Sequence, residues 1–434
     1  MRMRRMAVLS KGLATGLAKG LATGVALATA ATGCGASGAS DAAGGTKDSS
    51  GVVTLDWEMW AGSEDEKAQL DHLAQLVTRQ DPKIRIKLRT APFNDYFTKL
   101  QTEFAAGKQA CIVSLQSLRL GAYADLMEPL TAGQGFAPAA LEALKLDGKQ
   151  LALPYDLASM LVYYNKDAFA KAGLAEPKAG WTIADFEKAA KALTKDGKAG
   201  FGMSLSDLHM LSMLLTYNGA TPITGDLKLQ MDSQAMVDAL TWYAGLARSK
   251  AGSVPASSSE GGWGETQFLN GNAMMAVDGS WNVGSALKDA KFAVGLAPLP
   301  AGPGGSKTYI ADSGFGVAKS CPYKEQAVKA VSVLTGVEAQ TYLAGVGRGF
   351  PARTEQQAVY EQFLVKQDQA NAGAVRQAMA AIRDGLAGGV PLFTTKNWDT
   401  VNKLMAQHLI QTYTGAQGAK DALATIQQQG ARGQ

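Results

Sequence analysis

The sequence predicts an α/β protein with two domains or one two-lobed body, and three observations support this prediction. The chain has 434 residues, which is too many for one ordinary compact core. Segments with alternating apolar residues are followed by segments with apolar residues at helical spacing, in regular succession along the chain. The composition, 46% hydrophobic and 18% charged, is that of a globular protein. We therefore expect sheets covered by helices.

The first strongly patterned segments form a strand, a helix and a second strand. In residues 52–60, VVTLDWEMW, apolar residues alternate with polar ones, so Trp57 is expected in the core. Trp60 breaks the alternation at the carboxyl end of this strand. Residues 61–77 have a helical apolar stripe, and residues 81–90 alternate again. This order is typical of a βαβ unit.

The same succession continues toward the carboxyl end, where the last residues are mostly helical. We expect further strands within 111–116, 151–156, 159–166, 272–281, 291–305 and 313–320. We expect further helices at 93–107, 119–130, 181–197, 232–249 and 323–336.

Charge and residue counts exclude some classes of function. The net charge of +4 is scattered without a basic block, which argues against nucleic acid as a partner. Only three histidines are present, so a histidine-rich metal site is poorly supplied, and we expect no metal and no cofactor.

The amino terminus is typical of an export signal. Arg2, Arg4 and Arg5 precede GLATGVALATAATG, which is apolar and rich in small residues. This stretch is too short to span a bilayer, which takes roughly 20 residues. We expect a signal peptide over 1–33 and a flexible Gly/Ala/Ser-rich tether over 34–51. General and twin-arginine export both stay open.

Cys34 ends the small-residue stretch, and this arrangement resembles a bacterial lipoprotein signal. The cysteine would then be lipidated and hold the protein at the extracellular face of the cell membrane. Ala31 and Thr32 depart from the usual pattern, so free secretion is the alternative. Cys111 and Cys321 would remain as a pair in an oxidising compartment, as a disulfide or as two free thiols.

Several motifs together resemble the family 1 extracellular solute-binding proteins, the carbohydrate-binding lipoproteins of ABC importers. The most specific of them is LPYDLASMLVYYNKDAFAKAGL, followed by GWTIADFEKAAKAL. The others are IVSLQSLRLGAYADLMEPL, FLNGNAMMAVDGSW, DSGFGVAKS and LTGVEAQTYLAGVGRGFPAR. This chain has Ala110 and Cys111 where the family commonly has Pro-Asp.

The resemblance implies a two-lobed periplasmic-binding-protein type II fold, in which each lobe is a sheet covered by helices and a hinge joins the lobes. We expect the first lobe at 52–176 plus 312–352 and the second at 177–311 plus 353–432. In this fold the strand that Cys111 opens lies antiparallel beside the strand that Cys321 ends. The resemblance thus implies a Cys111–Cys321 disulfide, with two buried free thiols as the alternative.

Ligands of open α/β sheets lie beyond the carboxyl ends of the strands, and sugar rings stack on aromatic side chains while their hydroxyls need polar partners. These rules and the resemblance together give the candidate ligand residues Trp60, Ser63, Glu64, Gln116, Ser117, Arg119, Tyr155, Asp156, Trp263, Asp278, Trp281, Ser313, Gly314, Phe315, Arg348 and Trp398. Several of them have a structural alternative. Glu64 could only favour a helix amino terminus, Arg119 could form a structural salt bridge, and any tryptophan could be core.

The expected function is that of a non-enzymatic receptor. It would bind a mono- or oligosaccharide between the lobes as a monomer and deliver it to the permease subunits of an ABC transporter. Receptors for a polyamine or glycerol phosphate stay open, although a phosphate would favour more Arg or Lys in the cleft. A secreted glycoside hydrolase would need two carboxylates about 5–9.5 Å apart, and no such motif is visible. The sequence does not identify the sugar, its length or its linkage.

Overall fold

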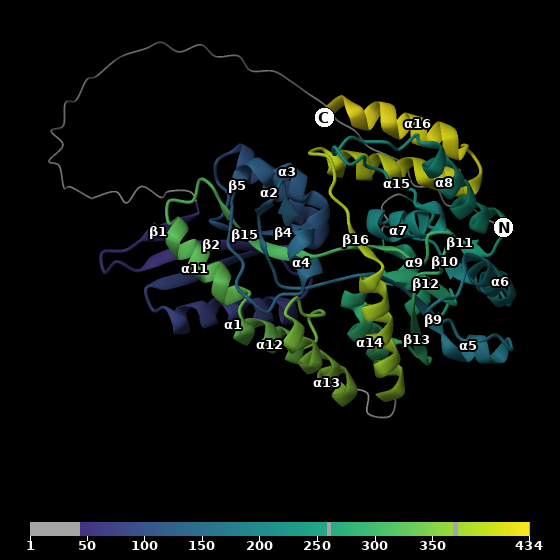
Figure 1. The fold of residues 1–434 in the computed structure, drawn as a ribbon, viewed down its shortest axis with the longest axis horizontal. Coiled ribbons are helices and arrows are strands. Elements are labelled where there is room, and N and C mark those ends of the chain that lie inside the picture. Colours follow the sequence, from purple (N-terminus) through teal and green to yellow (C-terminus); the bar gives the residue numbers. More distant parts are fainter. Residues whose placement is uncertain (1–43, 258–261, 368–371, 434) are drawn as a thin grey trace, which may run out of the picture. The chain divides into compact units, whose positions relative to one another are not determined.

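The computed structural model describes residues 44–257, 262–367 and 372–433. The predicted signal peptide and Cys34 lie outside these residues, as does the first part of the predicted tether. Two main sheets with helices on their faces dominate the fold (Figure 1), which confirms the predicted α/β class. Among the helices of the described ranges, none combines the length and the apolar character that crossing a bilayer requires.

The first sheet is built around β2 (Val53–Trp60), which runs parallel to β3 (Ile84–Ala91) and β4 (Ile112–Gln116). β15 (Ser313–Ala318) returns from far along the chain and pairs antiparallel with β4, with Val317 opposite Ile112. The remaining strands are β1 (Gly45–Lys47), β5 (Met127–Glu128) and β8 (Leu153–Pro154). β1 pairs with β2, so residues 45–47, which the sequence placed in the tether, are part of the first sheet.

Helices cover both faces of the first sheet. α1 (Glu64–Gln80), α11 (Lys324–Leu334) and α12 (Val337–Gly345) share one core with Trp57. α2 (Phe93–Ala105) and the short α3 (Leu120–Tyr123) contribute to the core on the other face. Trp57 is fully buried, as predicted from the alternation of β2, and its ring meets Phe315 edge-on at 5.1 Å.

The second sheet has the order β11 (Gly252–Ser253), β10 (Phe201–Gly202), β12 (Met275–Gly279), β9 (Met160–Asn165) and β13 (Val294–Pro298). β9 is antiparallel to both β12 and β13. The pairing of β9 therefore places residues 160–165 with the second sheet, although the sequence assigned them to the first lobe. The other lobe boundaries stay a prediction.

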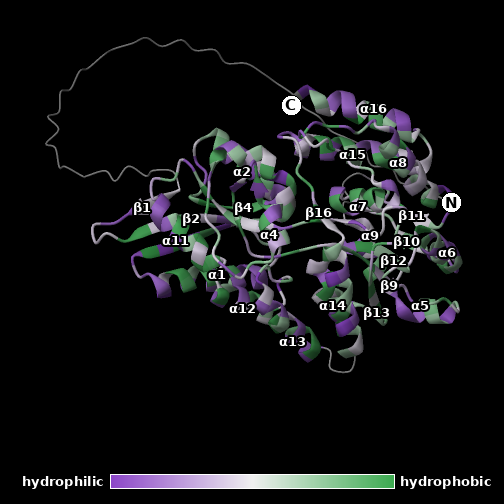
Figure 2. Ribbon diagram, in the orientation of Figure 1, coloured by the Kyte–Doolittle hydropathy of each residue, from purple (hydrophilic) through white to green (hydrophobic). Residues whose placement is uncertain are grey.

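α14 (Ala372–Ala387) packs on β13 and β9, while α7 (Asp207–Asn218) and α9 (Trp263–Leu269) pack against β12. Figure 2 shows hydrophobic and hydrophilic residues alternating along the helices, as expected for helices with one buried face. The other helices of the described chain are α4 (Pro138–Ala143), α5 (Lys166–Lys171), α6 (Ile183–Leu193), α8 (Gln234–Arg248), α10 (Val283–Asp289), α13 (Gln357–Gln367), α15 (Trp398–Thr414) and α16 (Ala419–Gly430). Two small sheets pair β6 (Lys145–Leu146) with β7 (Lys149–Gln150), and β14 (Thr308–Ile310) with β16 (Gly389–Pro391).

A disulfide joins Cys111 to Cys321, with their Cα atoms 4.9 Å apart. Cys111 immediately precedes β4, and Cys321 lies just beyond the end of β15. The backbone N–H of Ala318 also donates to the carbonyl of Cys111 at 3.0 Å. The antiparallel pairing of two strands that are distant in sequence thus brings the cysteines together.

Candidate functional site

Two neighbouring cavities lie where residues of both sheets approach each other. The large cavity has a volume of about 810 Å³, and the small cavity about 420 Å³. Phe93, Trp281, Asn282 and Ser285 line both cavities, so these residues mark their junction. Trp60 and Gln116 at the carboxyl ends of β2 and β4 line the large cavity, as the strand-end rule predicts.

About half of the sequence-predicted ligand residues are brought together here. The large cavity is lined by Trp60, Gln116, Tyr155, Asp156, Trp281, Ser313 and Arg348, and the small cavity by Asp278 and Trp281. These residues come from the strand ends of both sheets and from the segments that connect the sheets. A contact of any of them with a ligand stays a prediction.

The other predicted residues line neither cavity, and their surroundings explain why. Ser63 caps α1 by accepting from the Glu66 N–H at 3.2 Å, and Glu64 is exposed in the first turn of the same helix. Arg119 donates from Nε to Asp399 Oδ1 at 2.8 Å, which is the structural salt bridge that the sequence left as an alternative. The rest of this set comprises Ser117, Gly314, Phe315 and Trp398, which are buried, and Trp263, which begins α9 half-buried.

Trp281 lies just beyond β12, in the short 3₁₀ helix η3 (Ser280–Asn282). A methyl group built on Gly279 would overlap the Trp281 ring, so the ring lies directly over this glycine. His209 approaches the ring edge-on, with ring centroids 6.1 Å apart. The absence of a side chain at residue 279 therefore allows Trp281 to cover the end of β12 and face the cavities.

Two aspartates, the buried Asp312 and the half-buried Asp156, join the segments that connect the sheets. Asp156 Oδ1 accepts from the Ser313 N–H at 2.7 Å, and Asp312 Oδ1 accepts from the Ala158 N–H at 3.1 Å. Each segment thus supplies a carboxylate to the backbone of the other. Burial raises the pKa of Asp312 well above its usual range, and the nearby Asp156 carboxylate adds to this shift.

Asp156→Asn should make the stability of the protein less dependent on pH. Burial raises the pKa of Asp156 from 3.8 to about 7, so the stability that its protonated form contributes is present below about pH 4 and lost as the pH rises through about 7. The variant should therefore match the wild type near pH 4 and exceed it at pH 8 by about 1–3 kcal/mol. Urea unfolding between pH 4 and pH 8 measures this difference.

Asp289→Asn is the matched control, because Asp289 also lines the large cavity but lies exposed at the end of α10. Its unfolding curve should follow the wild type at every pH. Parallel curves for Asp156→Asn and the wild type would contradict the prediction.

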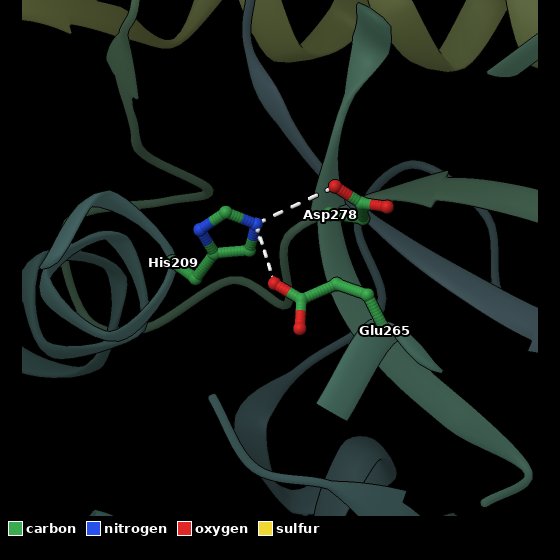
Figure 3. Close-up of side chains that lie close together, drawn as sticks. All are labelled: His209, Glu265 and Asp278. Carbon is green, nitrogen blue, oxygen red and sulfur yellow. Dashed lines mark hydrogen bonds and ion pairs between the residues drawn. The ribbon is translucent and has the colours of Figure 1, made fainter. Parts of the chain in front are cut away.

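A buried cluster of three ionisable residues lines the small cavity. It consists of His209 from α7, Glu265 from α9 and Asp278 from β12 (Figure 3). His209 Nε2 lies 2.7 Å from Glu265 Oε1 and 3.4 Å from Asp278 Oδ1. Asn282 donates to both oxygens of Asp278, at 3.0 and 2.9 Å. Burial alone would lower the pKa of His209, but the two carboxylates outweigh it and raise this pKa to about 10. At neutral pH His209 is therefore an imidazolium beside two carboxyl groups, and burial raises the pKa of Asp278.

The same three residues are the set that could hold a metal ion, since their ligand atoms lie within 4.8 Å of one another. A metal-bound histidine normally donates its second ring N–H to a partner. His209 Nδ1 is buried and has no hydrogen-bond partner in the described part of the chain. The donor set therefore fits an ion pair better than a metal centre.

Sequence reasoning missed several cavity residues. Phe93 lies just beyond the carboxyl end of β3, and Trp60 is the last residue of β2, so the strand-end rule could have identified Phe93 as well. His209 and Glu265 lie on helices, and no local signal marks them as neighbours of Asp278. Other missed residues that line the large cavity are Asp65, Glu66, Gln69, Lys288, Asp289, Phe363 and Gln367.

Comparison with known proteins gives one family and one fold. Residues 61–341, more than half of the chain, match the family described as bacterial extracellular solute-binding protein. A curated relative, the sn-glycerol-3-phosphate-binding periplasmic protein of Brucella abortus (strain 2308), is 29% identical over 174 residues, which cover 38% of this chain and 40% of the relative. The chain thus spans well under two thirds of the length of that relative.

Solved structures match over nearly their whole length. An ABC substrate-binding protein from Listeria monocytogenes in complex with cycloalternan has a TM-score of 0.75 and 24% identity, covering 87% of this chain and 97% of that chain. Maltose-bound MalE3 of T. maritima has a TM-score of 0.69 and 22% identity, covering 87% and 98%. These likenesses establish the fold. The family match over residues 61–341 shows that the chain belongs to the bacterial extracellular solute-binding proteins, which are non-enzymatic components of transporters.

Proposed function

We propose that this protein binds an uncharged mono- or oligosaccharide in the two cavities and delivers it to the permease of an ABC importer. The observation that carries the proposal is the combination of charge and aromatic residues on the cavity walls. Among the described residues, six carboxyl side chains line the cavities: Asp65, Glu66, Asp156, Glu265, Asp278 and Asp289. Only three basic side chains accompany them: His209, Lys288 and Arg348. Carboxylates accept hydrogen bonds from sugar hydroxyls and repel anionic ligands.

Glycerol phosphate is the second candidate, because the Brucella relative is named for it. A phosphate favours converging Arg or Lys side chains or helix amino termini. Arg348 is already engaged, since its Nη1 donates to Gln69 Oε1 at 3.3 Å and lies 3.7 Å from Glu66. The excess of carboxylates therefore weighs against a phosphorylated ligand.

A polyamine would suit the carboxylates but not the other polar groups. Gln69, Gln116, Asn282 and Gln367 line the cavities with amide groups, which donate as well as accept. A fully protonated polyamine offers no acceptor for these donors, whereas a sugar hydroxyl both donates and accepts. This mixture of donors and acceptors favours the sugar.

The location and mechanism proposed here follow from the sequence and the family. The signal peptide would export the chain, and lipidation of Cys34 would tether it to the extracellular face of the cell membrane. The two sheets with their helices would form lobes that close on the sugar by a population shift about the connecting segments. The protein would act as a monomer that meets the permease subunits.

The test is isothermal titration calorimetry against glucose, maltose, maltotetraose, cellobiose, sn-glycerol 3-phosphate and spermidine. We expect saturable binding of a neutral sugar and none of the phosphate or the polyamine. Trp281→Ala should weaken sugar binding about tenfold or more, because an aromatic contact contributes about 1 kcal/mol or more.

Trp242→Ala is the matched control. Trp242 is also half-buried but lines neither cavity; it stacks on Tyr217 at 4.4 Å elsewhere on the second lobe. Its sugar affinity should equal that of the wild type. Binding of only the phosphate or only spermidine would replace the proposed ligand class, and consumption of a sugar would make the protein an enzyme.

A further inference from the structure

Phe93 is unusual among the large apolar residues because 40% of its surface is exposed. It is the first residue of α2 and lines both cavities. Leu269, at the end of α9, is also exposed and lines the small cavity. Exposed apolar surface inside a cavity is more informative than exposed apolar surface elsewhere, since such surface marks a contact for a ligand.

Two aromatic rings of the first sheet and its helix α2 pack against the Phe93 ring. Trp60 meets it edge-on at 5.4 Å, and Phe97 does so at 5.7 Å. Trp60 is in turn packed against Tyr96 at 5.3 Å. The tryptophan that the sequence singled out as a ligand platform therefore supports a second ring, and Phe93 is the more exposed of the two.

Phe93 and Trp281 approach the junction of the cavities from different sheets. α2 packs on β2 and β3 of the first sheet, whereas Trp281 follows β12 of the second. Both rings line both cavities, together with the polar side chains of Asn282 and Ser285. A ligand at the junction thus meets an aromatic ring from each sheet and the polar side chains that line both cavities.

We propose that Phe93 is a specificity-determining ligand residue, which contacts one apolar face of a sugar ring while Trp281 contacts the same ring from the second sheet. The inference rests on the proposed function and adds the shape of the ligand to it. Pyranose rings present C–H faces to aromatic rings and carry hydroxyls around their edge. Asn282 and Ser285 line both cavities and offer polar partners for these hydroxyls, and Asp278 and Glu265 line the small cavity.

The arrangement selects cyclic over acyclic polyols. An open-chain polyol such as glucitol carries a similar set of hydroxyls but offers no rigid C–H face to the two aromatic rings. It should therefore bind weakly, and its binding should depend little on Phe93. A ring that carries a carboxylate or phosphate should be rejected by the carboxylates of the small cavity.

The experiment compares wild type, Phe93→Ala, Phe93→Trp and Leu126→Ala by calorimetry with glucose, maltose, maltotetraose, cellobiose and glucitol. For any of these sugars that binds the wild type, Phe93→Ala should weaken binding about tenfold, and Phe93→Trp should restore it to within about threefold. Leu126 is the matched control, because it is 39% exposed and lines neither cavity. Its alanine variant should bind like the wild type.

The outcomes separate the two proposals. If the wild type binds a sugar and Phe93→Ala binds it equally well, the role of Phe93 is refuted and the sugar receptor stands. If glucitol binds as tightly as glucose, the preference for a ring is refuted. If the wild type binds none of the sugars, the proposed function fails and this inference fails with it. Melting temperatures of the variants should stay at the wild-type value, because the substituted side chains are partly exposed.

Discussion

Replacing Cys111 and Cys321 together by alanine will lower the free energy of unfolding by about 2–5 kcal/mol. The disulfide joins residues separated by 210 positions. A cross-link over a loop of this length removes much conformational entropy from the unfolded chain, and the loop-entropy estimate gives about 5 kcal/mol as a ceiling. The bond also ties the start of β4 to the end of β15, two strands that come from distant parts of the sequence.

Guanidinium unfolding of the oxidised wild type, the reduced wild type and the double variant tests this prediction. All three should carry Cys34→Ala, so that no third thiol takes part. The reduced wild type and the double variant should unfold at similar concentrations, and both well below the oxidised protein. Free thiols at both positions in non-reducing mass spectrometry, or equal midpoints for all three proteins, would contradict it.

Trp398→Ala will lower the free energy of unfolding by about 3–5 kcal/mol and leave the sugar affinity of the remaining folded protein unchanged. Only 1% of Trp398 is exposed, and it lies at the start of α15 in the core that residues of β9 and β12 of the second sheet share. Its Nε1 donates to Asp207 Oδ2 at 2.9 Å. Removing the ring would leave both a large void and a buried carboxylate without this donor.

Trp398→Phe separates the two effects, because it keeps most of the apolar volume and removes the N–H donor. It should cost about 1–2 kcal/mol. Urea unfolding and calorimetry with the same sugars separate stability from binding. If Trp398→Ala were stable but bound sugar weakly, the sequence-based hypothesis of a ligand contact would be right and the core assignment wrong.

The strands of the first sheet illustrate what periodicity can predict. β2 and β3 follow from strict alternation, and Trp57 is buried as the alternation requires. The predicted strand 151–156 is reduced to β8, because the residues after Pro154 leave the first sheet and connect it to the second. Alternation reports which side of a segment is apolar, but it does not report which sheet the segment joins.

The residues of the candidate site also divide into those that local sequence predicts and those that depend on distant partners. Trp60 and Gln116 follow from the sequence because the position of a strand end is local information, whereas Trp281 follows from the family resemblance of its DGSW motif. Arg119 and Trp398 were not separable from ligand residues, because their partners, Asp399 and Asp207, are distant in sequence. Of the cluster around His209, only Asp278 was among the sequence-predicted residues, since three elements meet there only after folding.

By itself, the sequence determined the α/β class and the positions of the longer strands and of helices such as α1, α6 and α8, because these depend on the spacing of apolar residues along the chain. The tertiary structure decided which strand ends face one another and which tryptophans are buried. It also decided that the exposed Phe93 ring packs edge-on against Trp60. These features depend on contacts between residues far apart in the chain. Such contacts form when apolar faces pack and buried polar groups find partners, and that pairing is not encoded in any local pattern.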